Sequence, residues 1–310
     1  MLISSNYHYI RNTFEAKYPS IFGQMPGEFK NQLNQLAQLG SFVSQSDLQS
    51  NAEYIIRSNE KFVLITFDDG LKEQFEVAKP ILDELDIPAI YFINSINHLE
   101  RKVSMVHKIQ LVRSVASPKK IAEQVEHLGV KLSADEYTKA VTHYNYDSPE
   151  AAATKYLLNF KLQLSQRDEV VNKLFELFFD ESAMIKELYM SEEQLKLLAT
   201  ENALGNHTHA HLGLGIYDEE TIANEIKITK EYLERLTNQE ITTISYPYGS
   251  AEACAEPVPR IAEDFGHSVG FTMNRGIAQQ ETSLLMLNRF DCNDLPGGKN
   301  EKLFLDEFYS

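Results

Sequence analysis

The chain has 310 residues, of which 43% are hydrophobic and 24% charged, a balance that indicates a soluble globular protein and excludes disordered and fibrous classes. Its 29 Lys and Arg against 45 Asp and Glu leave a formal net charge of -16, which argues against nucleic acid or an anionic membrane surface as a partner. The two cysteines are too few for a disulfide framework and lack the CxxC spacing of a metal site.

The chain has no run of about 18 apolar residues, so we expect no transmembrane segment. Its N-terminus lacks the basic start and apolar run of a secretory signal, which predicts a cytoplasmic location. The length fits either two ordinary domains or one large α/β barrel with additions, and the barrel is our first interpretation.

Apolar runs that alternate with helical patterns predict an α/β architecture near the start of the chain. Residues 62–67 form the clearest predicted strand, because they are apolar, rich in strand-forming residues and followed at once by an acidic pair. A helix over about 71–84, bent at Pro80, leads to a second strand over 88–93. These three elements form a βαβ unit.

Residues 103–190 interrupt this alternation, since helical patterns replace strands there, for example over 161–179. We interpret 103–190 as an α-helical insertion, which leaves 1–102 and 191–310 for the α/β domain. The α/β alternation resumes with a helix over 191–200, opened by a capping box.

Asp218 is placed to cap the next helix, and further strands are predicted over 242–246 and 268–272. Polar residues follow the predicted strand ends directly. This pattern matches an α/β barrel, whose active site lies at the C-terminal ends of its strands, so we expect these side chains to converge.

An acidic pair, Asp68 and Asp69, and a histidine cluster, His207, His209 and His211, are the candidate metal ligands. Catalytic zinc sites use three protein ligands with imidazole nitrogen and carboxylate oxygen atoms, and they keep a fourth position open for water. Two histidines and one carboxylate would meet this requirement. His207 and His211 share a face if the segment is helical, whereas His207 and His209 share one if it is extended, so spacing alone does not choose between them.

These residues resemble the motifs of the polysaccharide deacetylases of the NodB-homology type, carbohydrate esterase family four. Residues 66–70 (TFDDG) match the first motif, and residues 207–211 (HTHAH) match the family's H-[ST]-x-x-H motif. A third motif, normally R-x-P-Y, is present in part at residues 245–249 (SYPYG). The likeness covers the stretches 60–95 and 190–295.

The resemblance implies a distorted (β/α) barrel of seven or eight strands that carries the α-helical insertion. It also implies a metal-dependent hydrolase that removes acetyl from an N-acetylated amino sugar in polysaccharide or glycan metabolism. The partner would be an N-acetylated sugar or glycan. Because the insertion is longer than the barrel needs, we expect it to limit access and to favour short substrates.

The resemblance further implies a role for each matching residue. It makes Asp68 the general base and the backbone N–H of Tyr248 the oxyanion donor, and it leaves His209 as an intervening structural residue. The implied ligands of a divalent metal, most simply Zn²⁺, are Asp69, His207 and His211.

Two family features are missing from the sequence. Ser245 stands where the third motif has an arginine that orients the base, and Arg275 and Arg289, which follow predicted strands, are the candidate replacements. The late histidine that often acts as general acid is also absent, which leaves His8 as the better candidate and His267 as the second.

Three other functions remain open from the sequence. The same site could act on another amide, a formamide or an acetyl ester. The missing arginine and late histidine would suit a catalytically inert carbohydrate-binding protein, although such decay would not be expected to spare both metal-binding motifs. An amidohydrolase barrel could use a His-x-His pair, but that pair normally lies on an early strand.

Overall fold

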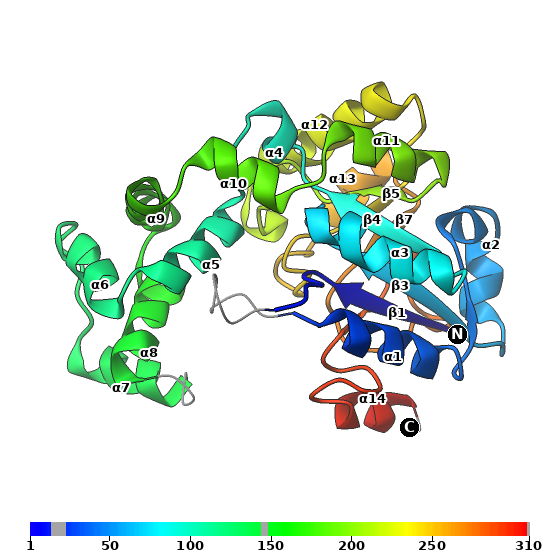
Figure 1. Ribbon diagram of the computed structural model, residues 1–310, viewed down its shortest axis with the longest axis horizontal. Coiled ribbons are helices and arrows are strands. Elements are labelled where there is room, and N and C mark those ends of the chain that lie inside the picture. The colour runs from blue at the N-terminus through cyan, green and yellow to red at the C-terminus, as the bar shows by residue number, and fades with distance from the viewer. Residues whose placement is uncertain (14–22, 144–147, 309–310) are drawn as a thin grey trace. The chain divides into compact units, whose positions relative to one another are not determined.

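A computed structural model of the protein describes residues 1–13, 23–143 and 148–308 (Figure 1). The described chain forms two compact units, the first α/β and the second α-helical. The first unit contains Met1–Thr13, Gly23–Lys102 and the chain from Ile185 onward, and the second contains Val103–Met184. The second unit therefore ends a few residues before position 190, where the sequence-based insertion ends.

Among the described residues, eight strands form one sheet in the first unit, and all of their pairings are parallel. The sheet order is β7, β6, β5, β4, β3, β1 and β8, with β2 also paired to β3. The strands are β1 (Leu2–Tyr7), β2 (Ser41–Phe42), β3 (Phe62–Phe67), β4 (Ala89–Ile93), β5 (Leu204–Asn206), β6 (Thr243–Ser245), β7 (Val269–Phe271) and β8 (Phe290–Asp291).

The sheet curls until its two ends approach each other. Phe271, the last residue of β7, forms a parallel bridge with Leu287, which leads directly into β8. Since β8 also pairs with β1, the strands form the distorted (β/α) barrel that the sequence predicts. The predicted fold class is confirmed.

The central strand β3 is buried on both faces, which explains its unbroken apolar sequence. Val63, Ile65 and Phe67 pack in a cluster with helix residues, whereas Leu64 packs with Ile90 in a second cluster. Successive side chains of a strand point to opposite faces, so this alternation is the expected one.

Helices cover the barrel strands, with α1 and α3 lying over β1, β3 and β4 in Figure 1. Two predicted helix starts are confirmed, since Ser191 forms a capping box and the Asp218 side chain accepts a hydrogen bond from Thr221 N. The α-helices of this unit are α1 (Pro26–Leu36), α2 (Gln45–Arg57), α3 (Lys79–Glu84), α4 (Ile96–Leu99), α11 (Glu192–Thr200), α12 (Glu219–Thr237), α13 (Val258–Asp264) and α14 (Lys302–Phe308).

The helix expected over 71–84 contains a π-helical turn, η1 (Gln74–Ala78), directly before α3. Pro80 has no N–H to donate, and its ring crowds the carbonyl of Glu76, four residues earlier. The turn widens accordingly, and Lys79 N–H donates to the carbonyl of Gln74. Pro80 therefore changes the helix type where the sequence predicts a bend.

The second unit is built from helices, and α5 packs against α9 with Leu111, Val112, Val171 and Leu174 buried. The helix predicted over 161–179 begins at Leu164, after a second π-helical turn. No helix within the described ranges is long and apolar enough to span a membrane. The helices are α5 (Met105–Val115), α6 (Pro118–Glu126), α7 (Ala134–His143), α8 (Pro149–Tyr156), η2 (Leu157–Lys161), α9 (Leu164–Phe178) and α10 (Glu181–Leu188), which crosses the unit boundary.

Candidate active site

The acidic turn after β3 is held in a conformation that is unusual for an aspartate. Asp69 has φ 76° and Gly70 has φ 62°, both in the left-handed region, which a non-glycine residue adopts only at an energetic cost. Buried Gln74 braces the turn, because its Nε2 donates to the Asp68 carbonyl at 2.6 Å and its Oε1 accepts from Leu71 N at 3.1 Å. These bonds from Gln74 fix the turn that carries both aspartates at the end of β3.

The histidine-bearing turn after β5 is held in a similar way. Thr208 and His211 have φ values of 62° and 58°, again in the left-handed region. The Asn206 side chain accepts from Thr208 N at 2.8 Å, and Asn94 donates to the carbonyls of His207 and Thr208. Ala210 N donates to the buried Glu225 carboxylate at 2.8 Å.

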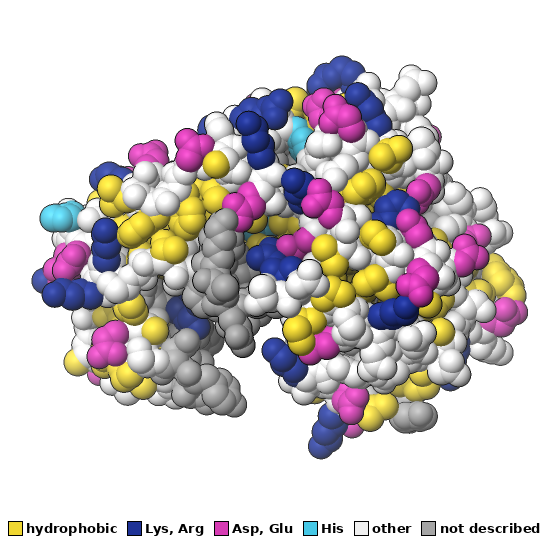
Figure 2. Space-filling model, viewed as in Figure 1, with side chains coloured by type: hydrophobic (Ala, Val, Ile, Leu, Met, Phe, Trp, Pro, Cys, Tyr) yellow, Lys and Arg dark blue, Asp and Glu magenta, His cyan; other side chains and the backbone are white. Residues whose placement is uncertain are grey.

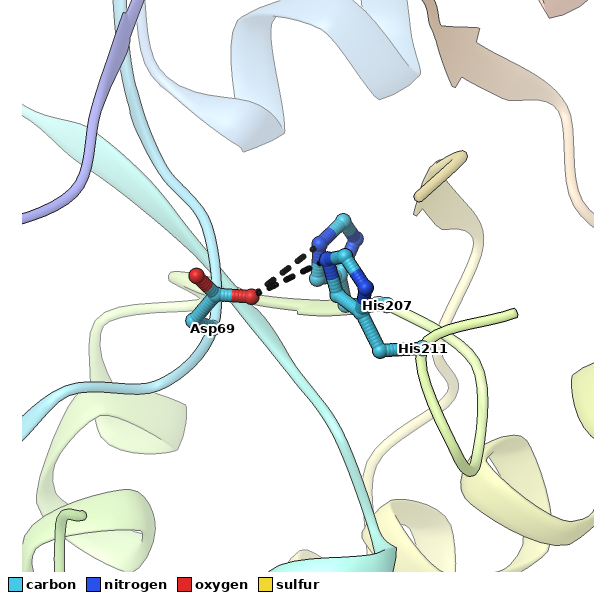
Figure 3. Close-up of side chains that lie close together, drawn as sticks. All are labelled: Asp69, His207 and His211. Atoms are coloured by element: carbon cyan, nitrogen blue, oxygen red, sulfur yellow. Dashed lines mark ion pairs between the residues drawn. The ribbon is translucent and has the colours of Figure 1, made fainter. Parts of the chain in front are cut away.

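The two turns bring Asp69, His207 and His211 together, all of them buried (Figure 3). Asp69 Oδ1 lies 3.5 Å from His207 Nε2 and 3.4 Å from His211 Nε2. The imidazole rings meet edge to face with centroids 5.0 Å apart. His209, the other histidine of the turn, is bonded instead to Ser95 and Glu100.

The donor atoms of this group match a four-coordinate divalent cation. Ligand atoms about 2.0–2.1 Å from a tetrahedral zinc are about 3.3–3.4 Å apart, close to both Oδ1–Nε2 distances. These distances are longer than the 2.7–3.2 Å typical of N–H···O hydrogen bonds. His207 Nδ1 lies 2.7 Å from the Ser245 carbonyl, which can only accept, so Nδ1 carries the proton and the Nε2 lone pair faces Asp69.

The charge of the site also favours a cation. Burial opposes protonation of His207, but the neighbouring carboxylates of Asp68 and Asp69 outweigh it and raise the pKa of this histidine. A site that raises the pKa of a buried imidazole stabilises positive charge, and a divalent cation would supply it.

Asp68 is held by Arg289, which lies just before β8. The two side chains are buried and form a bidentate pair, with Nη1–Oδ1 and Nη2–Oδ2 distances of 2.9 and 2.8 Å. Burial alone would raise the pKa of Asp68, but the Arg289 guanidinium and, secondarily, His207 hold it well below its usual range. Ser245 Oγ also accepts a hydrogen bond from Arg289 at 2.7 Å, so the small residue at the motif position makes room for this arginine. Arg275 pairs with Asp294 instead.

Of the other predicted site residues, His8 and Tyr248 lie beside the Asp69, His207 and His211 group, whereas His267 is buried elsewhere. His8 directly follows β1, and its Nε2 lies 3.8 Å from Asp69 Oδ2 with 37% of the side chain exposed. Tyr248 is 52% exposed, and its ring centroid is 5.0 Å from that of His211. His267 is buried beside Asn206, and burial lowers its pKa to about 3, so the structure does not bring it to the site as a proton donor.

The sequence did not point to several residues that support the site. Asn94 and Ser95 follow the end of β4, so the strand-end pattern that found the aspartates could have found them as well. Gln74, Glu100 and Glu225 carry no comparable signal, because each lies in or beside a helix and not at the end of a strand.

The protein is a parallel barrel with a buried Asp-His-His group and a second, ionised aspartate at the C-terminal ends of its strands. This is the layout of a metal-dependent hydrolase. The family model for polysaccharide deacetylases matches residues 56–155 and 168–269, more than half of the chain. The chain therefore belongs to the polysaccharide deacetylase family, whose members are metal-dependent hydrolases of non-peptide C–N amide bonds.

Individual relatives agree with this family. The putative polysaccharide deacetylase YxkH of Bacillus subtilis is 28% identical over 102 residues, and the matched segment covers 33% of this chain but only 36% of that protein. The fold is shared with the Streptococcus pyogenes deacetylase PplD in complex with acetate, at TM-score 0.59, 18% identity and coverage of 99% and 97% of the two chains. It is also shared with IcaB from Ammonifex degensii, at TM-score 0.53, 18% identity and coverage of 96% and 94%.

Proposed function

We propose that this protein is a metal-dependent deacetylase that removes acetyl from an N-acetylated amino sugar of a polysaccharide or glycan. The observation that carries the proposal is the pairing of two elements in one buried site. One is the Asp69, His207 and His211 group with metal-ligand spacing, and the other is Asp68, kept ionised by Arg289.

In this proposal the metal ligands are Asp69, His207 and His211, and imidazole with carboxylate suits Zn²⁺. When bound, a divalent cation polarises the acetyl carbonyl and lowers the pKa of water towards about 7. The proton of His207 stays on Nδ1, which donates to the Ser245 carbonyl, and this keeps the Nε2 lone pair available to the metal.

Asp68 acts as the general base. Each of its carboxylate oxygens receives one bond from Arg289 and keeps a second lone pair, so it can still accept a proton from the attacking water. The water oxygen forms a bond to the acetyl carbon, the C–N bond breaks, and acetate and the free amine leave. The guanidinium fixes the direction of the acceptor throughout.

Two further roles complete the reaction. The backbone N–H of Tyr248 donates to the oxygen on which negative charge develops, a contact worth about 2.7–4 kcal/mol in other enzymes. His8, half-exposed beside Asp69, supplies the proton that the departing amine takes up.

The test is metal analysis of the purified protein combined with acetate release from N-acetylated mono-, di- and polysaccharides, an acetyl ester and a formamide. We expect bound metal and acetate from N-acetylated sugars, and Asp68→Asn should lower the rate by about 10²–10⁴-fold. Release from the ester or formamide alone would support the other substrate class. Sugar binding without turnover of any substrate would support an inert carbohydrate-binding protein.

A further inference from the structure

His209 lies between the two histidines assigned to the metal, and both of its ring nitrogens are engaged elsewhere. Its Nδ1 is 2.8 Å from Ser95 Oγ, and its Nε2 is 2.8 Å from Glu100 Oε1. Only 9% of the residue is exposed. The carboxylate can only accept, so Nε2 carries a proton and no ring nitrogen is left to bind a metal.

The contacts of His209 connect the histidine turn to two helices. Ser95 Oγ also lies 2.6 Å from Thr229 Oγ1 on α12, and Glu100 follows the end of α4. A backbone bond runs in parallel, since Ile96 N donates to the His209 carbonyl at 3.1 Å. Glu100, His209, Ser95 and Thr229 thus form one continuous hydrogen-bonded chain, which we call the His209 clamp.

The turn that the clamp holds is not one that its sequence favours. Thr208 and His211, on either side of His209, adopt left-handed backbone conformations, which are unfavourable for residues other than glycine. Such conformations persist only where surrounding contacts enforce them. Between them, the His209 side chain anchors the turn to Ser95 and Glu100 through its two ring nitrogens.

The arrangement of Ser95, His209 and Glu100 has the order of a nucleophile, base and orienting acid, but it cannot work as one. Ser95 is fully buried and its hydroxyl is shared with Thr229, so no substrate carbonyl can reach it. The contacts therefore serve to position the turn.

We propose that His209 is a positioning residue of the metal centre. Through Glu100 and Ser95 it holds the turn so that His207 and His211 present Nε2 to one cation together with Asp69. This inference rests on the proposed function. It assigns part of the metal affinity to residues that do not bind the metal themselves. Hydrogen-bonded residues around metal ligands commonly contribute to affinity in this way.

The experiment measures the dissociation constant for Co²⁺ and Zn²⁺ by competition with a chelating dye, with Co²⁺ absorption as a second readout of ligand geometry. His209→Ala should weaken binding by about 10–100-fold. His209→Gln, which can keep one of the two side-chain bonds, should fall between this variant and the wild type. Activity lost in His209→Ala should return at saturating metal, which a purely structural defect would not allow.

Glu100 provides a variant that leaves the core intact, because 41% of its side chain is exposed. Glu100→Ala should also weaken binding, and adding it to His209→Ala should cause little further loss, because both remove the same contact. Lys102→Ala is the matched control. Lys102 contacts Glu100 at Oε2, 2.7 Å away, on the oxygen that His209 does not use, so its removal should leave the affinity within about twofold.

The outcomes separate the two proposals. If the wild type binds neither metal, the metal centre of the proposed function is wrong. If the wild type binds metal and both His209→Ala and Glu100→Ala bind within twofold of it, the positioning role is overturned while the proposed function stands.

Discussion

At the scale of single residues, the catalytic aspartate proposed here is oriented from an unexpected part of the chain. Arg289 reaches Asp68 from the position just before β8, while Ser245 occupies the motif position where the family has arginine. The planar guanidinium binds both carboxylate oxygens at once, which an ammonium group cannot reproduce. The direction of the carboxylate therefore depends on one side chain.

Arg289→Lys is expected to lower kcat by about 10²-fold, since a shift of about 1 Å in a reacting group is enough for such a loss. It should also destabilise the fold by up to about 3–5 kcal/mol, because a buried carboxylate loses its partner. Acetate release and urea unfolding measure the two effects. Arg275→Lys is the matched control, since this partly exposed residue pairs with Asp294 away from Asp68, and equal losses in both variants would contradict the assignment.

The lowered pKa of Asp68 predicts how the stability of the protein depends on pH. Its folded pKa is held below the unfolded value of about 3.9, so its stabilising contribution is complete above that value and is lost as pH falls through the folded pKa. In the presence of chelator, and with His207 replaced by Gln in both proteins because Asp68 also raises the pKa of that histidine, the difference in unfolding free energy between proteins with Asp68 and with Asp68→Asn should stay constant from about pH 7 to pH 5 and shrink below about pH 4. Urea unfolding at a series of pH values measures this difference, and a decline that begins near neutral pH would count against it.

At the scale of elements, the site depends on how the strands end and on what braces the turns that follow. The π-helical turn η1 places Gln74 beneath the acidic turn, where its amide bonds the carbonyls of His8 and Asp68 and the N–H of Leu71. One side chain thus links the ends of β1 and β3. The wider helix turn before Pro80 is part of this geometry.

Gln74→Leu should destabilise the protein by about 2–4 kcal/mol, because it leaves buried backbone groups without partners at about 1–3 kcal/mol each. It should also reduce acetate release, since both aspartates belong to the turn that Gln74 holds. Glu76→Ala, on the exposed side of the same π-helical turn, should change stability by no more than about 0.5 kcal/mol. Denaturant unfolding of both variants checks the difference, and similar values for the two would show that the brace is unimportant.

At the scale of the whole molecule, the acidity belongs to the α/β unit. Residues 103–184 hold 10 Lys and Arg against 11 Asp and Glu, so the rest of the chain carries a net charge of -15 out of -16. Figure 2 shows acidic and basic side chains interspersed on one face of the molecule. An acidic unit around a candidate cation site attracts metal ions and repels phosphate-rich ligands.

The chain forms two compact units, and the candidate metal ligands all lie in the α/β unit, so we expect metal to stabilise that unit alone. At a metal concentration 100 times the dissociation constant, the α/β unit should gain about 2.7 kcal/mol, which raises its unfolding temperature and leaves the helical unit unchanged. Calorimetry with chelator and then with Zn²⁺ measures both transitions, and chelator should also abolish acetate release. In His211→Ala the metal-dependent shift should disappear; a shift of both transitions in the wild type would contradict the expectation.

By itself, the sequence determined the barrel and the two strongest motifs, because these are local patterns. An apolar strand run that ends in an acidic pair, a capping box and a histidine cluster can each be read within about ten residues. The same locality explains the errors, since the π-helical turn before Pro80 and the late start of α9 depend on hydrogen bonding that no short pattern specifies.

Only the tertiary structure decided which distant residues meet. It brought Arg289 and not Arg275 to Asp68, buried His267 away from the centre, and joined His209 to Glu100 across more than a hundred residues of chain. Sequence spacing left the choice among the histidines open, because it depended on two left-handed residues in one turn. Such contacts follow from strand order and barrel curvature, which place residues remote in sequence at the same end of the sheet.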